Sequence, residues 1–206
     1  KESQLALESA QKILENAANS DSLLEITERE ENQELGAVYL SLGNTHKALG
    51  DREKDRQISI NRQGVLPWQC IPLHQSVPAD AANFYEISKN NYLAAERIVP
   101  DSSTSRSAQL NRLSILLENN NINASTQALW NNIHSQLEAQ TPNRATVYAQ
   151  INLAKQGSCL KQLSNDESVD WDDITNLLKS AAQNAEALAD VPAESYALGN
   201  LAGLYE

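Results

Sequence analysis

The chain has 206 residues, and only 5% of them are aromatic, so a β-sheet would have few of the residues that favour it. The formal net charge is −11 and no run of Lys and Arg offsets it, which argues against nucleic-acid binding. No apolar stretch approaches the roughly 20 residues that a membrane-spanning helix requires, so we expect no membrane contact. These features predict an all-α protein, with residues 1–206 forming a single domain.

Apolar residues recur with the period of an α-helix along most of the chain, between mostly short polar turns. The nine predicted helices cover residues 3–19, 22–49, 51–62, 79–98, 104–119, 124–139, about 142–161, 171–189 and 192–206. On four of these helices the pattern also predicts which residues face the core. They are Leu7, Ala10, Leu14 and Ala17; Ala81, Phe84, Tyr85, Ser88, Tyr92 and Ala95; Leu129, Trp130, Ile133 and Leu137; and Ile174, Leu177, Leu178, Ala181, Ala185 and Leu188.

Two glycines in the stretch LSLGNTHKALGD, residues 40–51, have different predicted roles. Gly43 lies inside a helix, where glycine costs about 1 kcal/mol relative to alanine, so we expect it to admit a neighbouring helix. Gly50 is predicted to end that helix, and Asp51 to cap the next one. Farther along, Thr141 is the predicted N-cap and Pro142 the first residue of a later helix.

Residues 64–80 contain three prolines and lack a helical period, which predicts an irregular loop inserted between helices. Trp68, Ile71 and Leu73 make this loop unusually apolar. Two interpretations follow: the loop binds a partner, or Trp68 fills a gap between helices. A loop of this length is often functional or disordered, and the sequence does not decide its role.

Cys70 and His74, in the same loop, are the pair closest to a catalytic arrangement, because a thiol and an imidazole can form a nucleophile–base dyad. Such dyads need rigid support, usually from separate elements, whereas these residues are four apart in a proline-broken segment. We therefore do not expect an enzyme. A hydrolase that uses Cys70 and His74 remains the third of three hypotheses.

The remaining motifs give no sign of a cofactor or a metal site. His46 and His134 are far apart in the sequence, and we expect structural or surface roles for both. The acidic run at 166–173 lacks the glycine and the ligand spacing of a calcium loop. No nucleotide-binding loop or zinc motif is present in the sequence, so we expect no cofactor.

A spacing of large and small residues repeats along the chain. It appears as Tyr39-x-x-Leu42-Gly43-x-x-His46, as Leu110-x-x-Leu113-Ser114-x-x-Leu117, and as Leu198-x-x-Leu201-Ala202-x-x-Tyr205. This pattern resembles the tetratricopeptide repeat, in which the small residue after Leu accepts a side chain of the neighbouring helix. The resemblance implies degenerate helical hairpins stacked into a right-handed α-α superhelix. A plain helical bundle, with coincidental Leu-small pairs, is the alternative.

A more specific resemblance covers most of residues 30–206 apart from the 64–80 loop. The segments LSLGNTHKALGD, ANFYEISKNNY, SAQLNRLSILLEN, ALWNNIHSQL, NRATVYAQINLAKQ, ITNLLKSAAQNAEAL and VPAESYALGNLAGLYE occur in this order. Together they look like the tetratricopeptide region that precedes a CHAT domain, a caspase-like protease domain, in large and mainly cyanobacterial proteins. The resemblance implies that the chain recruits substrates for, or restrains, an attached C-terminal CHAT domain. We also expect a fragment of a longer protein, because the pattern stops at Glu206 midway through a repeat.

In such a superhelix the first helix of each hairpin lines the concave face. Asparagine side chains there could hold a peptide backbone with a paired donor and acceptor, and Lys or Arg could take an acidic group. Spacing from each Leu-small pair gives the candidate peptide-binding residues, which are Leu40, Asn44, Lys47, Asn111, Arg112, Tyr148, Asn152, Lys155, Tyr196 and Asn200.

The main expectation is therefore a non-catalytic module that binds a protein or a peptide. The second hypothesis is a structural spacer or an oligomerisation platform, in which the open final half-repeat with Leu201, Leu204 and Tyr205 pairs with another copy. The compartment stays undetermined, with the cytoplasm as the default, because a targeting segment could precede Lys1.

Overall fold

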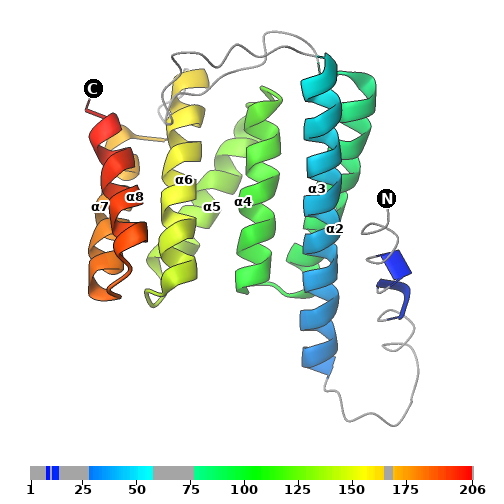
Figure 1. Cartoon of the computed structure of the whole chain (residues 1–206), viewed down its shortest axis with the longest axis horizontal. Helices are drawn as coiled ribbons and strands as arrows, with labels where there is room; N and C mark the ends of the chain where they lie inside the picture. Colours follow the sequence, from blue (N-terminus) through cyan, green and yellow to red (C-terminus); the bar gives the residue numbers. More distant parts are fainter. Residues whose placement is uncertain (1–7, 10, 14–27, 58–76, 165–168, 206) are drawn as a thin grey trace. The chain divides into compact units, whose positions relative to one another are not determined.

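A computed structural model of the chain describes residues 8–9, 11–13, 28–57, 77–164 and 169–205, and every regular element among them is an α-helix (Figure 1). The helices are α2 (Glu28–Gln57), α3 (Ala79–Ile98), α4 (Ser103–Glu118), α5 (Ala124–Glu138), α6 (Arg144–Leu163), α7 (Trp171–Ala187) and α8 (Val191–Gly203). The all-α prediction is confirmed for these residues. Residues 8–9 and 11–13 are helical as predicted, but Leu7, Ala10, Leu14 and Ala17 lie outside the described residues.

The chain divides into two compact units. Unit 1 comprises Lys1–Ile60 and Val77–Ile115, and unit 2 comprises Asn61–Ser76 and Leu116–Glu206. Each unit has its own packed helices, and they are described separately below. Most of the predicted loop at 64–80, including Trp68, Cys70, Ile71, Leu73 and His74, lies outside the described residues. The described end of that loop is shorter than predicted, because α3 already begins at Ala79.

Unit 1 is built on the antiparallel pair α2 and α3, which lie side by side (Figure 1). Three glycines of α2 each face one large side chain of α3. A Cβ added at Gly36 would lie 2.5 Å from Cγ2 of Val99, the C-cap residue of α3. A Cβ at Gly43 would lie 2.5 Å from Tyr92 Cδ1, and a Cβ at Gly50 would lie 2.7 Å from Tyr85 Cε1. The three glycines are seven residues apart along α2, and the three large residues that face them are seven apart in the opposite order. One alignment of the two helices therefore satisfies all three contacts. We call these three positions the glycine sockets.

Gly43 thus has the role predicted for it, whereas the prediction for Gly50 was wrong. Helix α2 continues through Gly50 to Gln57, and Gly50 is a socket for Tyr85. The Lys47 Nζ to Asp51 Oδ2 ion pair, at 2.9 Å, spans the glycine on the helix surface. Because tertiary packing of Tyr85 outweighs the poor helix propensity of glycine, a Gly-Asp pair that is typical of a helix end lies in a helix interior.

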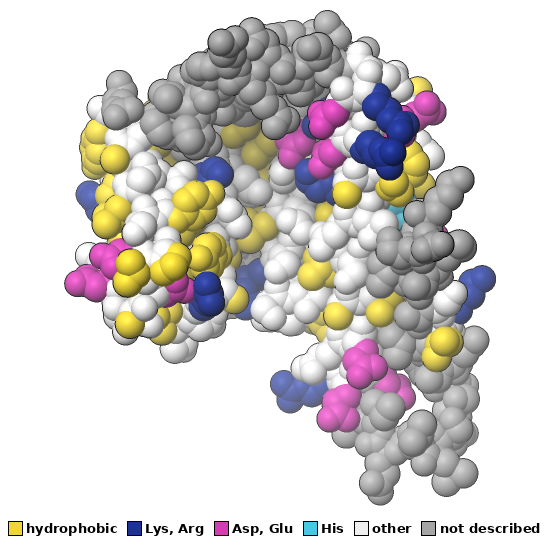
Figure 2. Space-filling view, viewed as in Figure 1, with side chains coloured by type: hydrophobic (Ala, Val, Ile, Leu, Met, Phe, Trp, Pro, Cys, Tyr) yellow, Lys and Arg dark blue, Asp and Glu magenta, His cyan; other side chains and the backbone are white. Residues whose placement is uncertain are grey.

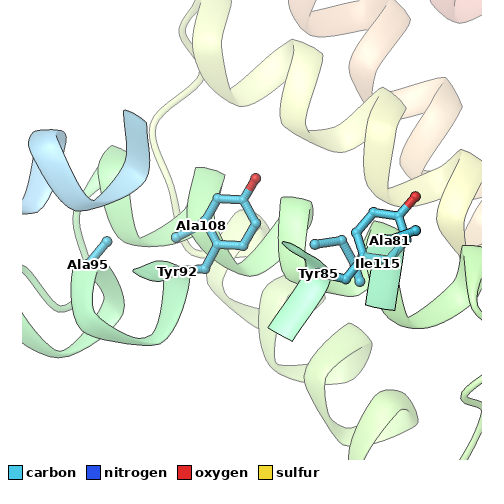
Figure 3. Close-up of a cluster of buried hydrophobic side chains, with 6 residues drawn as sticks. All are labelled: Ala81, Tyr85, Tyr92, Ala95, Ala108 and Ile115. Atoms are coloured by element: carbon cyan, nitrogen blue, oxygen red, sulfur yellow. The ribbon is translucent and has the colours of Figure 1, made fainter. Parts of the chain in front are cut away.

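The core of unit 1 surrounds Tyr85 and Tyr92, whose rings project from the same side of α3 (Figure 3). Ala81 and Ala95 of α3 and Ala108 and Ile115 of α4 complete this buried cluster. The predicted buried face of residues 79–98 is confirmed except for Phe84, which is only partly buried and lies against His46 with ring centroids 6.4 Å apart.

Unit 2 packs α5, α6, α7 and α8 around buried leucines, isoleucines and alanines. Trp130 of α5 fills the space beside Gly157 of α6 and donates from Nε1 to the Leu153 carbonyl at 3.1 Å. The four predicted core residues of α5 are buried, as are those of α7 except Leu188, which is 42% exposed. Leu188 is exposed because α7 ends at Ala187.

The turns of unit 2 close with left-handed residues. Asn120 and Ala189 have φ values of 53° and 54°. In each turn the backbone N–H of the following residue donates to a carbonyl in the last turn of the preceding helix. Asn121 N donates to Leu116 O at 2.8 Å, and Asp190 N donates to Ala185 O at 2.9 Å. Helix α6 starts later than predicted: Asn143, not Thr141, is its N-cap and forms a capping box with Thr146.

Candidate functional site

In unit 1, two of the predicted peptide-binding residues meet although they are far apart in the sequence. Asn44 Oδ1 of α2 accepts hydrogen bonds from Asn111 Nδ2 of α4 at 2.8 Å and from the Tyr92 hydroxyl at 2.9 Å. Asn44 is exposed, and its Nδ2 has no hydrogen-bond partner in the described part of the chain. The two hydrogen bonds hold the oxygen of the Asn44 carboxamide in place, and its Nδ2 can donate to an acceptor group of a ligand.

Lys47, one turn farther along α2, is engaged by an acid. Its Nζ donates to Asp51 Oδ2 at 2.9 Å, while the Tyr85 hydroxyl donates to Asp51 Oδ1 at 2.7 Å. Burial alone would raise the pKa of the Asp51 carboxyl, but hydrogen bonds from Lys47 and Tyr85 and the charges of Lys47 and Lys54 outweigh it and lower that pKa. Asp51 therefore stays ionised and reduces the positive charge that Lys47 can offer to a ligand.

Arg112 and Leu40 have partners that lessen their availability for a ligand. Arg112 Nε and Nη2 donate to the two carboxylate oxygens of Glu96, each at 2.8 Å, in a two-pronged ion pair between α4 and α3. Leu40 is partly buried against the core cluster of unit 1. Both therefore contribute to packing, which the spacing rule behind the predicted set did not anticipate.

In unit 2, the predicted residues Lys155 and Tyr196 join α6 to α8. Lys155 Nζ donates to the Tyr196 hydroxyl at 3.0 Å and lies 5.5 Å from the centre of its ring. Tyr196 is 40% exposed. An ammonium group over an exposed aromatic ring gives a surface that combines a cation with an apolar plane.

The three other predicted residues of unit 2 differ in accessibility. Asn152 is exposed on α6, and Tyr148 lies beneath Arg144, whose guanidinium carbon is 5.8 Å from the ring centre. Asn200 is buried, with Nδ2 donating to the Tyr196 carbonyl at 2.7 Å and Oδ1 without a partner among the described residues. Asn152, Lys155 and Tyr196 are thus the most accessible part of the predicted set in this unit.

Several charged partners were not identified from the sequence. Asp51 and Glu96 neutralise Lys47 and Arg112, and Asp190 accepts from Arg144 Nε at 3.0 Å. Of these pairs only Lys47 and Asp51, four residues apart on one helix, carry a signal in the sequence. The others join residues on different elements, so local periodicity could not find them.

The histidines of the described segments have packing contacts. His46 is buried, and its Nδ1 lies 2.8 Å from the Leu42 carbonyl, so Nδ1 carries the proton and donates. His134 stacks on Trp130, with ring centroids 5.0 Å apart and an angle of 12° between the planes. Its Nε2 is 3.9 Å from Glu138 Oε1.

Cys159 of α6 is disulfide-bonded, whereas Cys70 lies outside the described residues. A sulfur in a disulfide is no nucleophile until the bond is reduced. In the segments that the structure describes, no group of three or more His, Cys, Asp or Glu residues could hold a metal ion, and no helix is long and apolar enough to cross a membrane.

No protein-family model matches this chain, and no curated protein or solved structure matches it either.

Proposed function

We propose that the chain is a non-catalytic module that binds a protein or a peptide through the first helix of each hairpin. The finer fold that this proposal uses is a right-handed superhelix of tetratricopeptide-like hairpins. Support comes from the packing inside unit 1: Gly43, the small residue after Leu42, is a socket for Tyr92 of the paired helix. In the parent protein the module would recruit substrates for, or restrain, an attached CHAT-type protease domain, as the sequence resemblance implies.

The observation that carries the binding proposal is the contact between predicted residues from separate helices. Asn44 and Asn111 meet at 2.8 Å in unit 1, and Lys155 and Tyr196 meet at 3.0 Å in unit 2. Spacing alone placed these residues on one face, and in each unit they form a polar contact that presents further donors. Carboxamides, an ammonium group and a phenol ring suit a peptide with backbone acceptors and an acidic or polar side chain.

A peptide array probed with the purified chain tests this proposal. We expect selected peptides to bind, and fluorescence anisotropy to show about tenfold weaker binding for Lys155→Ala and Asn44→Ala, because each removes a hydrogen bond or a charge contact. Lys179→Ala is the matched control, since Lys179 is exposed on α7, a helix that carries none of the candidate residues. Peptides that bind all four proteins equally, or an array without any hit, would contradict the proposal.

An oligomerisation platform is the second candidate, and exposed apolar side chains favour it. Val191, Leu198 and Tyr205, on or just after α8, are 64%, 47% and 71% exposed, and hydrophobic side chains gather over the part of the surface that carries α7 and α8 (Figure 2). Sedimentation velocity separates the two candidates. A concentration-dependent dimer that Leu198→Lys abolishes supports the platform, whereas a monomer at all concentrations argues against it.

A hydrolase built on Cys70 and His74 is the weakest of the three. Cys70 and His74 are four residues apart in a proline-broken segment, whereas such dyads need rigid support, usually from separate elements. Peptidase activity that survives purification and is lost in Cys70→Ala would revive this hypothesis.

A further inference from the structure

A cavity of about 400 Å³ lies within unit 2, between α5, α6 and α7 and the turn that precedes α6. Its size falls in the range of pockets that hold small ligands. Four of its lining side chains are carboxamides, Gln140, Gln150, Asn176 and Asn184, and Ser180 adds a hydroxyl. None of these residues was singled out by the sequence, because three separate segments contribute them: the turn before α6, α6 and α7.

Gln150 is the polar group that points to a ligand. It is only 6% exposed, and its Oε1 accepts from Asn184 Nδ2 at 3.3 Å. Its Nε2 has no hydrogen-bond partner among the described residues, and Gln150 lines the cavity. A carboxamide that is held by its oxygen and lines the cavity leaves two N–H donors that a ligand acceptor there would satisfy.

The charges of the lining narrow the ligand class. Among the described residues that line it, only His134 and Glu138 are titratable, and none is Lys or Arg. A phosphate or a carboxylate would therefore find no fixed positive charge, and Glu138 would repel it. The carboxamides of the lining offer both hydrogen-bond donors and acceptors, so they favour an uncharged ligand that also carries both.

The apolar part of the lining separates a peptide from a sugar. Leu137, Pro142 and Leu177 contribute aliphatic surface beside the carboxamides. Aliphatic surface suits an apolar side chain, whereas the polar faces of a saccharide gain little from it. A short peptide offers both parts: backbone amides for Gln150 and Asn184, and an aliphatic side chain for the leucines.

We propose that this cavity binds a short uncharged peptide segment, with its backbone amides on Gln150 and Asn184 and an aliphatic side chain against Leu137 and Leu177. Gln150 and Asn152 lie on opposite sides of α6, since two residues turn a helix by roughly 200°. The cavity is therefore separate from the surface that carries Asn152, Lys155 and Tyr196, and its occupancy does not depend on the function proposed above.

The test uses the full chain and N-acetyl-leucinamide, an uncharged probe with two amide groups and one aliphatic side chain. Titration of isotope-labelled protein should shift the amide signals of Asn176, Ser180 and Asn184, with a Kd of about 1–10 mM for a probe of this size. Gln150→Met keeps the side-chain length and removes the donor, so binding should weaken about fivefold. Gln183→Met, the same substitution at an exposed position of α7 outside the lining, should leave binding unchanged.

Four results would overturn the proposal. They are no shift at probe concentrations tenfold above the expected Kd, equal binding by Gln150→Met, shifts produced by maltose but not by the peptide probe, and shifts confined to Lys155 and Tyr196. The last result would leave the function proposed above intact. If Gln150→Met does not fold, Asn176→Ala replaces it, because Asn176 is an exposed lining residue whose loss should weaken binding without disturbing the core.

Discussion

Unit 1 and unit 2 bring their helices together with different small residues. In unit 1, glycines at seven-residue intervals of α2 receive Val99, Tyr92 and Tyr85, so the large groups of one helix meet the backbone of the other. In unit 2, fully buried alanines occupy the interfaces of α6, α7 and α8, and Gly157, beside Trp130, has a role comparable to that of the sockets. Glycine lets two helices approach closely where a ring lies between them. Alanine places a methyl group in the interface and has a higher helix propensity.

This contrast predicts different sensitivities to substitution. The sockets at Gly43 and Gly50 tolerate no added methyl group, because the neighbouring tyrosine ring is fully buried and has no space into which it can move. An alanine interface should instead suffer from deletion of the large residues that it surrounds.

The largest effect is expected for Trp130→Ala in unit 2. It removes a 1% exposed side chain and the hydrogen bond to the Leu153 carbonyl, and should lower the free energy of unfolding by about 3–5 kcal/mol. Urea denaturation followed by circular dichroism measures this loss. A loss below about 1 kcal/mol would mean that unit 2 repacks freely around the vacated space.

Disulfide loss should affect unit 2 more than unit 1, since Cys159 belongs to unit 2. Cys159→Ser should cost about 2–4 kcal/mol, because the bond restricts the unfolded chain. Hydrogen exchange resolved by peptide should show faster exchange in α6 and α7 and little change in α2. Equal acceleration in both units would argue against their separation.

Gly43→Ala tests the glycine sockets directly. The added Cβ would overlap the Tyr92 ring, and the resulting strain should exceed the roughly 1 kcal/mol that alanine adds in helix propensity, for a net loss of about 1–3 kcal/mol. Gly199→Ala is the matched control. Nothing lies within 4 Å of its Cβ position, so this substitution in α8 should stabilise by up to about 1 kcal/mol. If both substitutions stabilise the protein, the sockets do not limit the approach of the helices.

Ala189→Gly is expected to stabilise unit 2. Ala189 follows the end of α7 with a φ of 54°, a conformation that costs L-residues more than glycine. The expected gain is about 0.5–1 kcal/mol in thermal unfolding, reduced by the greater freedom of glycine in the unfolded chain. Ala187→Gly, inside the same helix, should destabilise and provides the control.

The smallest effect concerns Asp51 in unit 1. Its pKa is lowered in the folded chain, so its contribution is present above the unfolded value of about 3.9 and is lost as pH falls through the folded pKa. Because the pair is partly exposed, we expect less than about 1 kcal/mol. Asp51→Asn should reduce stability at pH 7 and flatten its decline below pH 4. An unchanged acid transition would assign the decline to other carboxyl groups.

The sequence predicted most helices to within two residues where the structure describes both ends, because periodic burial decides where a helix lies. It failed at Gly50, where local rules favour a helix end and packing of Tyr85 overrides them. The matching seven-residue spacing of Gly36, Gly43 and Gly50 was a usable signal, but only in combination with the spacing of Tyr85, Tyr92 and Val99.

The candidate residues were less predictable than the helices. The spacing rule assigned Asn44, Asn111, Lys155 and Tyr196 to one face, but it did not specify the contacts of Asn44 with Asn111 and of Lys155 with Tyr196. It could not foresee that Glu96 would engage Arg112, because such pairing depends on how two helices cross. The cavity around Gln150 could not be predicted from the sequence for the same reason, because its lining depends on tertiary contacts among four segments.

The register of the glycine sockets also restricts how α2 and α3 can move. A slip of one residue would place all three large side chains against Cβ-bearing positions at once. The next matching alignment requires a jump of seven residues, roughly 10 Å along the axis, and it would leave one socket without its occupant. Gradual sliding of α2 along α3 is therefore blocked, and a force applied to one end of α2 should displace the two helices together.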